Sequence, residues 1–275
     1  MRFLAGLLAA LVLVAPASAG SAKGIRYLES RRQPDGGFAE PGRAADPALT
    51  SWAVLGLVAA GTPPDGAADY LASKPYGTAT DLELRIVALA ALDADVAKLA
   101  DELESLRQPD GSIGPLGNST IWGVLALRAA GRPIPEESLR RLLGLQARNG
   151  GWSWQQGVAA DTDDTAAALQ ALRAAGVTRN APSVRRGVAY LRAGQNRDGG
   201  WGLAPGARSN AQSTAWAIQG LRAAGVEPGQ RAFGYLTRLQ QGDGSFRYSA
   251  RFATTPVWVT SMVLAALARR PYPLA

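Results

Sequence analysis

The sequence predicts an all-α protein built from six units that each contain two helices. The first observation is a recurring Ala-Leu-Arg-Ala-Ala-Gly string, or a near copy, that closes successive segments at Gly61, Gly131, Gly176 and Gly225. Counting back 11 residues from each glycine reaches a threonine that opens an Ala-, Leu- and Trp-rich run. The spacing suits a helix that ends at a C-terminal glycine. The second observation is that a shorter helical pattern precedes each run.

The longer helices are expected to share one register residue near their start: Thr50, Arg85, Thr120, Thr165, Thr214 and Thr260, of which the second and last belong to degenerate copies. Successive register residues lie 35, 35, 45, 49 and 46 positions apart. The shorter helices are expected at 25–31, 67–71, 99–106, 137–145, 184–191 and 231–239. Such a period indicates a repeat architecture, in which each unit buries its apolar face against its neighbours.

A glycine-containing turn followed by a bulky residue lies between the two helices in five of the six units. We call it the tether turn; it occupies 33–38, 108–113, 149–152, 198–201 and 243–246. Glycine adopts the positive φ of tight turns, and a following aromatic ring can pack on neighbouring helices. We therefore interpret the tether turns as structural links between units. The second unit lacks one.

Composition excludes several chemistries, because the chain has no cysteine and no histidine. A disulfide framework, a cysteine nucleophile, a Ser-His-Asp triad and a Cys/His zinc site are all excluded, and we expect neither metal nor cofactor. The 29 Lys and Arg residues exceed the 22 Asp and Glu residues, but they are dispersed and only three are Lys. Nucleic-acid binding is therefore not expected. The positive balance allows a weak attraction to anionic membrane surfaces.

Residues 1–19 have the features of a cleaved secretory signal. Arg2 precedes an apolar run over residues 3–14, and Ala17-Ser18-Ala19 forms a small-residue cleavage site. The alternative, an uncleaved anchor, is less suited to a run well short of the ~20 residues that span a bilayer. We expect a single domain over residues 20–275 in a secreted or cell-envelope protein.

Residues 195–201, Gln-Asn-Arg-Asp-Gly-Gly-Trp, and the other tether turns resemble the QW-type repeats of the terpene cyclase and prenyltransferase superfamily. The resemblance covers about residues 24–270. Repeat length alone also fits an open helical solenoid. The resemblance instead implies a closed α/α toroid, six inner helices surrounded by six outer ones, with a central ligand cavity. A monomer is expected unless a partner supplies a wall of the pocket.

A second resemblance lies at residues 161–166, Asp-Thr-Asp-Asp-Thr-Ala, which is similar to the D-x-D-D-T-A motif of class II terpene cyclases such as squalene-hopene cyclase. It implies that Asp163 protonates an alkene or epoxide, that Asp161 and Asp164 keep it protonated and oriented, and that Thr165 belongs to the ligand site. Crowded carboxyls in an apolar cavity raise one another's pKa, whereas a helix N-terminus lowers it.

The repeats provide an internal control for this motif. Asp161 aligns with Asp46, Asp81 and Asn210, which is typical of an ordinary helix cap. The pair Asp163 and Asp164 has no acidic equivalent pair in any other unit; the residues aligned with Asp163 are Ala48, Glu83, Asn118, Gln212 and Trp258. A ligand-directed role for the pair is one interpretation, and capping or solvation is the other.

Tryptophans recur at one level of the long helices. Trp52, Trp122 and Trp216 each lie two positions after their register residue, and Trp258 lies one turn earlier than that level in the last unit. Aromatic faces stabilise cations, which suits carbocation chemistry if these rings line the cavity. Plain helix packing is the alternative.

We expect a cyclase-like protein that binds an isoprenoid or similar apolar small molecule, with Asp163 as candidate proton donor. Cyclases of this class usually place the pocket between two helical domains, whereas this chain accommodates one toroid and has no histidine to assist the acid. The alternatives are a non-catalytic ligand-binding module resembling the secreted cobalamin carriers, and an envelope interaction scaffold. A zinc-dependent protein prenyltransferase is excluded, since it needs Cys and His ligands.

Overall fold

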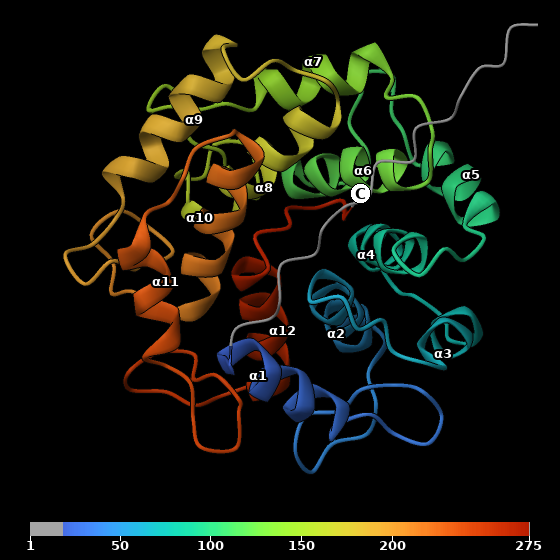
Figure 1. Ribbon diagram of the computed structural model, residues 1–275. Helices are drawn as coiled ribbons and strands as arrows, with labels where there is room; N and C mark the ends of the chain where they lie inside the picture. Colours follow the sequence, from blue (N-terminus) through green and yellow to red (C-terminus); the bar gives the residue numbers. More distant parts are fainter. Residues whose placement is uncertain (1–18, 275) are drawn as a thin grey trace, which may run out of the picture.

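The computed structural model describes residues 19–274, which form two concentric rings of helices (Figure 1). The inner ring consists of α2 (Pro47–Ala59), α4 (Ala79–Ala90), α6 (Gly117–Ala129), α8 (Thr162–Ala174), α10 (Ala211–Ala223) and α12 (Pro256–Leu267). The outer ring consists of α1 (Ala19–Glu29), α3 (Ala67–Ser73), α5 (Ala97–Ser105), α7 (Glu136–Gly144), α9 (Pro182–Ala193) and α11 (Gln230–Thr237). Each inner helix packs on the next, and α12 packs on α2. The ring is closed, so the predicted α/α toroid is confirmed and an open solenoid is excluded.

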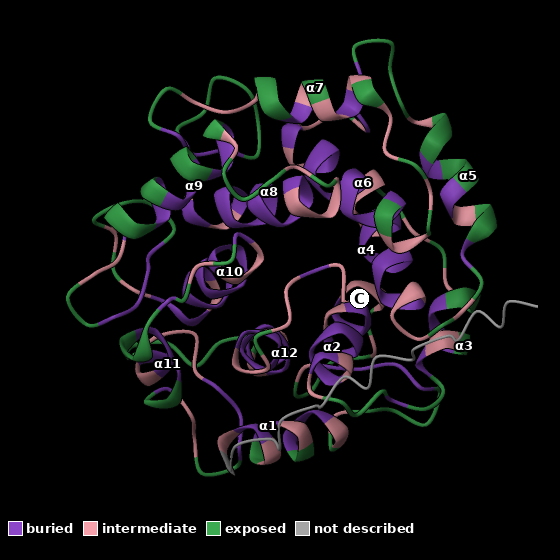
Figure 2. Cartoon of the chain, turned by 45° about the horizontal axis from the view of Figure 1, so that its top comes forward, coloured by how far each residue is buried: buried purple, intermediate pink, exposed green. Residues whose placement is uncertain are grey.

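Burial separates the two rings, as Figure 2 shows. In α6, 10 of 13 residues are buried, whereas in α7 only two of nine are. A helix that is apolar on all sides must be enclosed, while an amphipathic helix covers the core with one face. Small residues bring inner helices together: a Cβ on Gly220 of α10 would lie 2.7 Å from the Cα of Ala166 in α8.

The tether turns fix each inner helix to the outer helix of its unit. In each case the hydroxyl of the register threonine accepts the backbone N–H of the bulky residue in the turn, at 2.9–3.1 Å; the pairs are Thr50 with Phe38, Thr120 with Ile113, Thr165 with Trp152, Thr214 with Trp201 and Thr260 with Phe246. The indole N–H groups of Trp152 and Trp201 donate to carbonyls of their own outer helices, α7 and α9. These bonds lie within one unit, and the link to the next unit is the close approach of the turn to the following outer helix, as where Gly150 meets Arg186 of α9.

The unit without a tether turn uses a different link. Its register residue is Arg85, whose guanidinium donates to the carbonyl oxygens of Lys74 and Pro75, the latter at 2.9 Å. The cation thus takes the place that a threonine and a turn occupy in the other units. No loop comparable to a tether turn follows α3, which leaves the start of α2 less covered than its counterparts.

The loops that precede the inner helices link neighbouring units, and each link runs back to the unit before it in the chain. Three of these loops cover the N-terminus of the preceding inner helix: the backbone N–H groups of Asn118, Thr162 and Ala211 donate to carbonyls in the next unit at 2.7–3.0 Å. At the seam, Glu40 of the first unit accepts the N–H groups of Val257 and Trp258 at 3.0 Å each. A carboxylate at this position satisfies donors that a helix start leaves free.

The expected secretory signal lies outside the described residues, except for Ala19, which begins α1. Among the helices of residues 19–274, none combines the length and apolar character needed to cross a membrane.

Candidate functional site

Three tryptophans meet at the axis of the toroid. Trp52, Trp122 and Trp216 come from alternate inner helices, and their ring centroids lie 5.5–6.0 Å apart with edge-to-face geometry. Side chains from helices spaced around a ring contact one another only across its interior. These rings therefore face the lumen, and we call their level the tryptophan layer; it also contains Val87, Ala167 and Met262.

One helical turn nearer the N-termini lies a second level that faces the same way, because residues four apart share a helix face. We call it the mouth layer; it contains Ala48, Glu83, Asn118, Asp163, Gln212 and Trp258. Five of these six residues are partly exposed, and only Glu83 is fully buried. In the tryptophan layer, only Trp52 is more than slightly exposed. The lumen is thus open at the N-terminal ends of the inner helices and closed one turn below.

Asp163 has two unlike carboxyl oxygens. The side-chain amide of Gln212 donates to Oδ2 at 2.8 Å, whereas Oδ1 is buried and has no hydrogen-bond partner. Burial raises the pKa of Asp163 to about 7, and the neighbouring Asp164 adds to the rise, while the nearby polar side chains of Ser213 and Gln212 oppose it. Near neutral pH this carboxyl is therefore protonated in a substantial part of the molecules, and a neutral acid is available at the mouth layer.

Asp161 and Asp164 have different positions from Asp163. Asp161 is the N-cap of α8, and its Oδ1 accepts the backbone N–H of Asp164 at 2.8 Å. Asp46 and Asn210 cap α2 and α10 with the same geometry and distance. Asp164 accepts a hydrogen bond from the Asn118 side chain at 3.1 Å. Burial raises the pKa of both carboxyls, and the charge of Asp164 raises that of Asp161 further. Asp161 is a helix cap, as expected, and Asp164 links α8 to α6.

Thr165 is fully buried, and its hydroxyl lies at the tether turn. Its hydroxyl accepts the Trp152 N–H and donates to the Asp161 carbonyl at 2.5 Å. The register threonines point toward the turns, on the opposite side of the helix from the lumen residues two positions later. The expectation that Thr165 belongs to the ligand site stays a prediction, while in the structure its hydroxyl bonds within the tether.

An apolar pocket opens at the mouth, over the N-termini of α2 and α12. Its volume is about 600 Å³, and its lining includes Ala48, Leu49, Trp52 and Trp258. The pocket lies where the missing tether turn leaves α2 less covered. Two of the four expected tryptophans, Trp52 and Trp258, line it, whereas Trp122 and Trp216 are buried beneath the mouth layer. Asp163, on α8, lies across the ring from α2.

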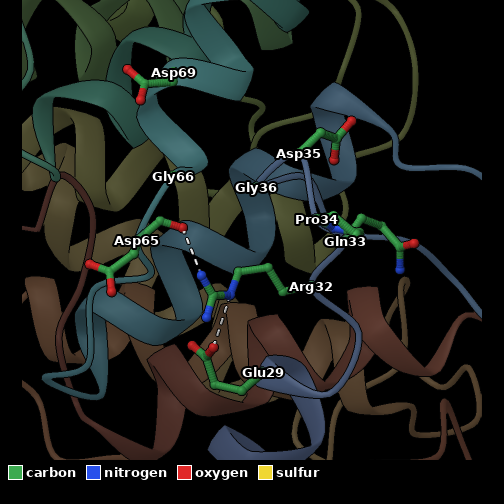
Figure 3. Close-up of a pocket in the computed structure, with 9 residues that line it drawn as sticks. All are labelled: Glu29, Arg32, Gln33, Pro34, Asp35, Gly36, Asp65, Gly66 and Asp69. Atoms are coloured by element: carbon green, nitrogen blue, oxygen red, sulfur yellow. Dashed lines mark hydrogen bonds and ion pairs between the residues drawn. The ribbon is translucent and has the colours of Figure 1, made fainter.

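A second cavity of about 620 Å³ lies outside the toroid, between the end of α1 and α3 (Figure 3). Its one cation, Arg32, pairs with Glu29 at 3.2 Å and donates to the carbonyl of Asp65 at 3.0 Å. The wall is the tether turn of the first unit, where a Cβ on Gly36 would lie 2.3 Å from the Gly66 oxygen. The close packing of this turn on Gly66, just before α3, leaves the cavity beside it. Within residues 19–274, no group of three or more acidic side chains is placed to hold a metal ion.

For four residues of the lumen, the neighbouring sequence does not predict that they are buried there. Glu83 is fully buried, neither of its carboxyl oxygens has a partner, and burial raises its pKa well above the ordinary value. Gln170 and Gln219 are buried below the tryptophan layer, and Tyr272 enters between them. The repeat alignment places Glu83 at the level of Asp163, but it does not predict its complete burial.

The fold and this lumen define an α/α toroid of the terpene cyclase and prenyltransferase kind. The family of the squalene-hopene cyclase C-terminal domain matches residues 131–274, which is more than half of the chain. The chain therefore belongs to this family. No curated protein sequence matches it.

Solved structures share the fold at low identity. A protein from Actinoplanes is 19% identical, with a TM-score of 0.72 over 91% of this chain and 98% of that one. The type II terpene cyclase MstE from Scytonema is 16% identical, with a TM-score of 0.67 over 90% of this chain and 96% of that one. An ent-copalyl diphosphate synthase from Streptomyces platensis is 21% identical, with a TM-score of 0.61 over 81% of this chain and 50% of that one. The Scytonema chain is matched over nearly its whole length, so the expectation that such cyclases need a second helical domain does not hold for it.

Proposed function

We propose that this protein is a single-toroid cyclase that binds an isoprenoid in the mouth of its lumen and starts cyclisation with a proton from Asp163. The observation that carries the proposal is the buried, unpartnered Oδ1 of Asp163, on a carboxyl whose pKa lies at about 7. A general acid is most effective when its pKa is near the working pH. The structural neighbour MstE has been solved with geranylgeranyl dihydroxybenzoate, described as its substrate.

The proposed first step transfers the Oδ1 proton to an alkene carbon or an epoxide oxygen. For an alkene, the π electrons form the new C–H bond, the adjacent carbon becomes a cation, and Asp163 becomes a carboxylate. Gln212 already donates to its Oδ2, and this bond strengthens as charge develops. The cation is attacked by a further alkene of the same chain, which closes a ring, and loss of a proton to solvent ends the sequence.

Aromatic rings line the mouth of the lumen across the ring from Asp163. Trp52 and Trp258 line the apolar pocket, and Trp52 continues into the buried cluster with Trp122 and Trp216. The negative face of an indole ring stabilises a nearby cation by about 2 kcal/mol when water is excluded. Tyr248 is a further neighbour, since the charge of Asp163 contributes to its raised pKa.

The test is mass spectrometric. Purified residues 20–275 are incubated with squalene and a panel of prenyl diphosphates, and isomeric cyclised products are sought. We expect product from the wild type and from Asp81→Asn, a carboxyl-to-amide change at the capping box of α4, and none from Asp163→Asn. Ligand binding without product in any variant would contradict catalysis and favour the non-catalytic binding module. Absence of both binding and product would favour the scaffold.

Membrane-surface association is proposed from the loops that surround the mouth. Of the five large exposed apolar side chains in residues 19–274, four lie in the loops before α8, α10 and α12: Trp154, Val158, Leu203 and Phe252. Arg208 and Arg251 are exposed in two of the same loops. Apolar groups beside cations suit the surface of an anionic bilayer.

Sedimentation with phosphatidylcholine vesicles, with and without phosphatidylglycerol, tests this association. We expect the wild type to bind the anionic vesicles, the double variant Leu203→Ser/Phe252→Ser to stay in solution, and the control Leu143→Ser, on the outer helix α7, to bind as the wild type does. A wild-type protein that remains in the supernatant would contradict the proposal.

Export is proposed from the sequence of residues 1–19. Cleavage after Ala19 leaves Gly20, whose carbonyl accepts the Gln240 side chain at 2.7 Å, so α1 keeps this contact with the last unit. N-terminal sequencing of the protein from the secreted or envelope fraction is expected to begin at Gly20. Recovery of an intact Met1 in that fraction would contradict cleavage.

A further inference from the structure

Opposite charges occupy opposite sides of the ring. Residues 177–255, which include α9 and α11, contain 11 arginines and three acidic residues. Residues 62–113, which include α3 and α5, contain ten acidic residues and four basic ones. We call the outer surface of residues 177–255 the basic flank and that of residues 62–113 the acidic flank. In a closed ring of six units the second and third units lie across from the fifth and sixth, as Figure 1 shows for these outer helices.

The arginines of the basic flank have few partners of opposite charge. All 11 are at least partly exposed, and among residues 19–274 only Arg222 of the 11 makes an ion pair, with Glu227 at 2.6 Å. Arg185 and Arg192 lie seven positions apart, on one face of α9, and that helix contains no acidic residue. A surface with a single sign of charge attracts a partner of the opposite sign.

The acidic flank is exposed in the same way. Each of its acidic residues except the buried Glu83 is at least partly exposed. Asp65 and Asp69 lie at the start of α3, which faces across the ring toward α9, and neither makes an ion pair in the part of the chain that the structure describes. Negative charge on this flank therefore remains available to a partner.

The basic flank differs from a surface that lies on a bilayer. Such surfaces combine cations with large apolar side chains. None of the five large exposed apolar side chains of residues 19–274 lies on α9 or α11. A polar surface of the opposite charge is, however, present on every copy of this chain. Because the two flanks lie on opposite sides of the ring, a twofold axis at either flank would bring like charges together, whereas a head-to-tail contact brings opposite charges together.

We propose that the basic flank of one copy docks on the acidic flank of a second copy, so that the protein forms head-to-tail rows. The contact uses the outer ring and leaves the apolar pocket at the mouth uncovered. Each row ends in one free flank of each sign, so the rows grow with protein concentration and do not stop at a dimer. Exposed charge pairs contribute little each and are screened by salt, so the rows separate into monomers at high salt. This inference does not depend on the proposed cyclisation.

Sedimentation velocity of the mature protein, residues 20–275, tests the rows. Exposed charges interact over ~30 Å in about 0.01 M salt and over ~3 Å in about 1 M salt. We expect the weight-average sedimentation coefficient of the wild type to rise with protein concentration at low salt and to stay at the monomer value at high salt. A wild type that is monomeric in both conditions overturns the proposal, and so does an association that salt does not weaken.

Charge reversal on each flank identifies the contact surfaces. Arg185→Glu/Arg192→Glu on α9 and Asp65→Lys/Asp69→Lys at α3 should each weaken association at low salt on the order of tenfold or more, because like charges then face one another. An equimolar mixture of the two variants should associate again, because the intact acidic flank of the first meets the intact basic flank of the second. Two variants that had merely lost their fold would not recover on mixing, and a mixture that stays monomeric overturns the pairing of flanks.

The control Arg26→Glu/Arg128→Glu changes the net charge as much as the α9 variant does, at exposed positions on α1 and α6 outside both flanks. It should associate as the wild type does, and equal weakening would overturn the assignment to the flanks. Arg185→Gln/Arg192→Gln repeats the test with neutral helix-forming side chains if the glutamate variant does not fold. If Arg185→Glu/Arg192→Glu loses binding to anionic vesicles but self-associates as the wild type does, the basic flank binds a membrane and the rows are refuted.

Discussion

Replacing Asp163 by Asn removes an acid whose Oδ1 is buried, while keeping the shape of the side chain. The pKa of Asp163 is raised from 3.8 to about 7, chiefly by burial. Between these values the unfolded chain releases the proton and the folded protein keeps it, so this group lowers the wild-type stability as pH rises from about 4 to about 7. Below about pH 4 both states hold the proton and the effect vanishes. Asn does not ionise, so the variant escapes this loss.

The size of this stability loss follows from the pH interval between the two pKa values. About three pH units at about 1.4 kcal/mol each give an upper limit of about 4 kcal/mol at pH 8. Asn keeps an oxygen for Gln212 but places an amide donor where Oδ1 has no partner, which costs about 1–3 kcal/mol at every pH. We expect the variant to be less stable than the wild type at pH 4 and more stable at pH 8.

Urea unfolding followed by tryptophan fluorescence between pH 4 and pH 8 measures this difference. The dependence of the unfolding free energy on urea should be unchanged, because the same surface is exposed. If the acid is kept at the expense of stability, Asp163→Asn should make the protein more stable at pH 8 and should also abolish its turnover. Parallel pH profiles for the wild type and Asp163→Asn would refute the argument, because they would show that the folded protein does not hold the proton.

The remaining predictions concern other buried groups. Glu83→Gln should lower the free energy of unfolding by about 1–3 kcal/mol at pH 4, because the new amide has no partner, and this loss should shrink or reverse at pH 8, because burial raises the pKa of Glu83 and the wild type loses stability as pH rises; thermal unfolding at both pH values checks this, and equal shifts would contradict it. Gly150→Ala should cost about 3 kcal/mol or more, because its φ is +90° and the new Cβ would lie 2.7 Å from the Arg186 carbonyl oxygen. Gly157→Ala, with a φ of +86° and no atom within 4 Å, should cost only about 1 kcal/mol. Equal costs in urea unfolding would show that the close approach has no effect.

The fold was predictable because the sequence signals for each unit lie within that unit. The helical period, the capping residue and the tether turn lie within one repeat, and their recurrence identifies the register without any long-range information. The same register predicted that Asp161 is a cap and placed Asp163 at the level of Glu83. The bond from Thr165 to the turn, which the other register threonines share, was not predicted, and the ligand role that the motif resemblance implies for Thr165 stays a prediction.

Other features of the site had no such signal. Glu40 caps α12 across the seam of the ring, at a separation of more than 200 residues, and nothing near it in the sequence indicates that role. The missing tether turn was visible in the sequence, but its consequence, an apolar pocket over α2, depends on which loops cover which helix starts.

The sequence by itself determined the all-α architecture, the six units and the acidic cluster at the start of α8, because these depend on residues close together in the chain. The tertiary structure alone decided which oxygen of Asp163 is left without a partner, which end of the lumen is open, and that Tyr272 fills the other. Ring closure brings residues of distant units onto one axis, and burial there, not local sequence, sets the pKa of the acid.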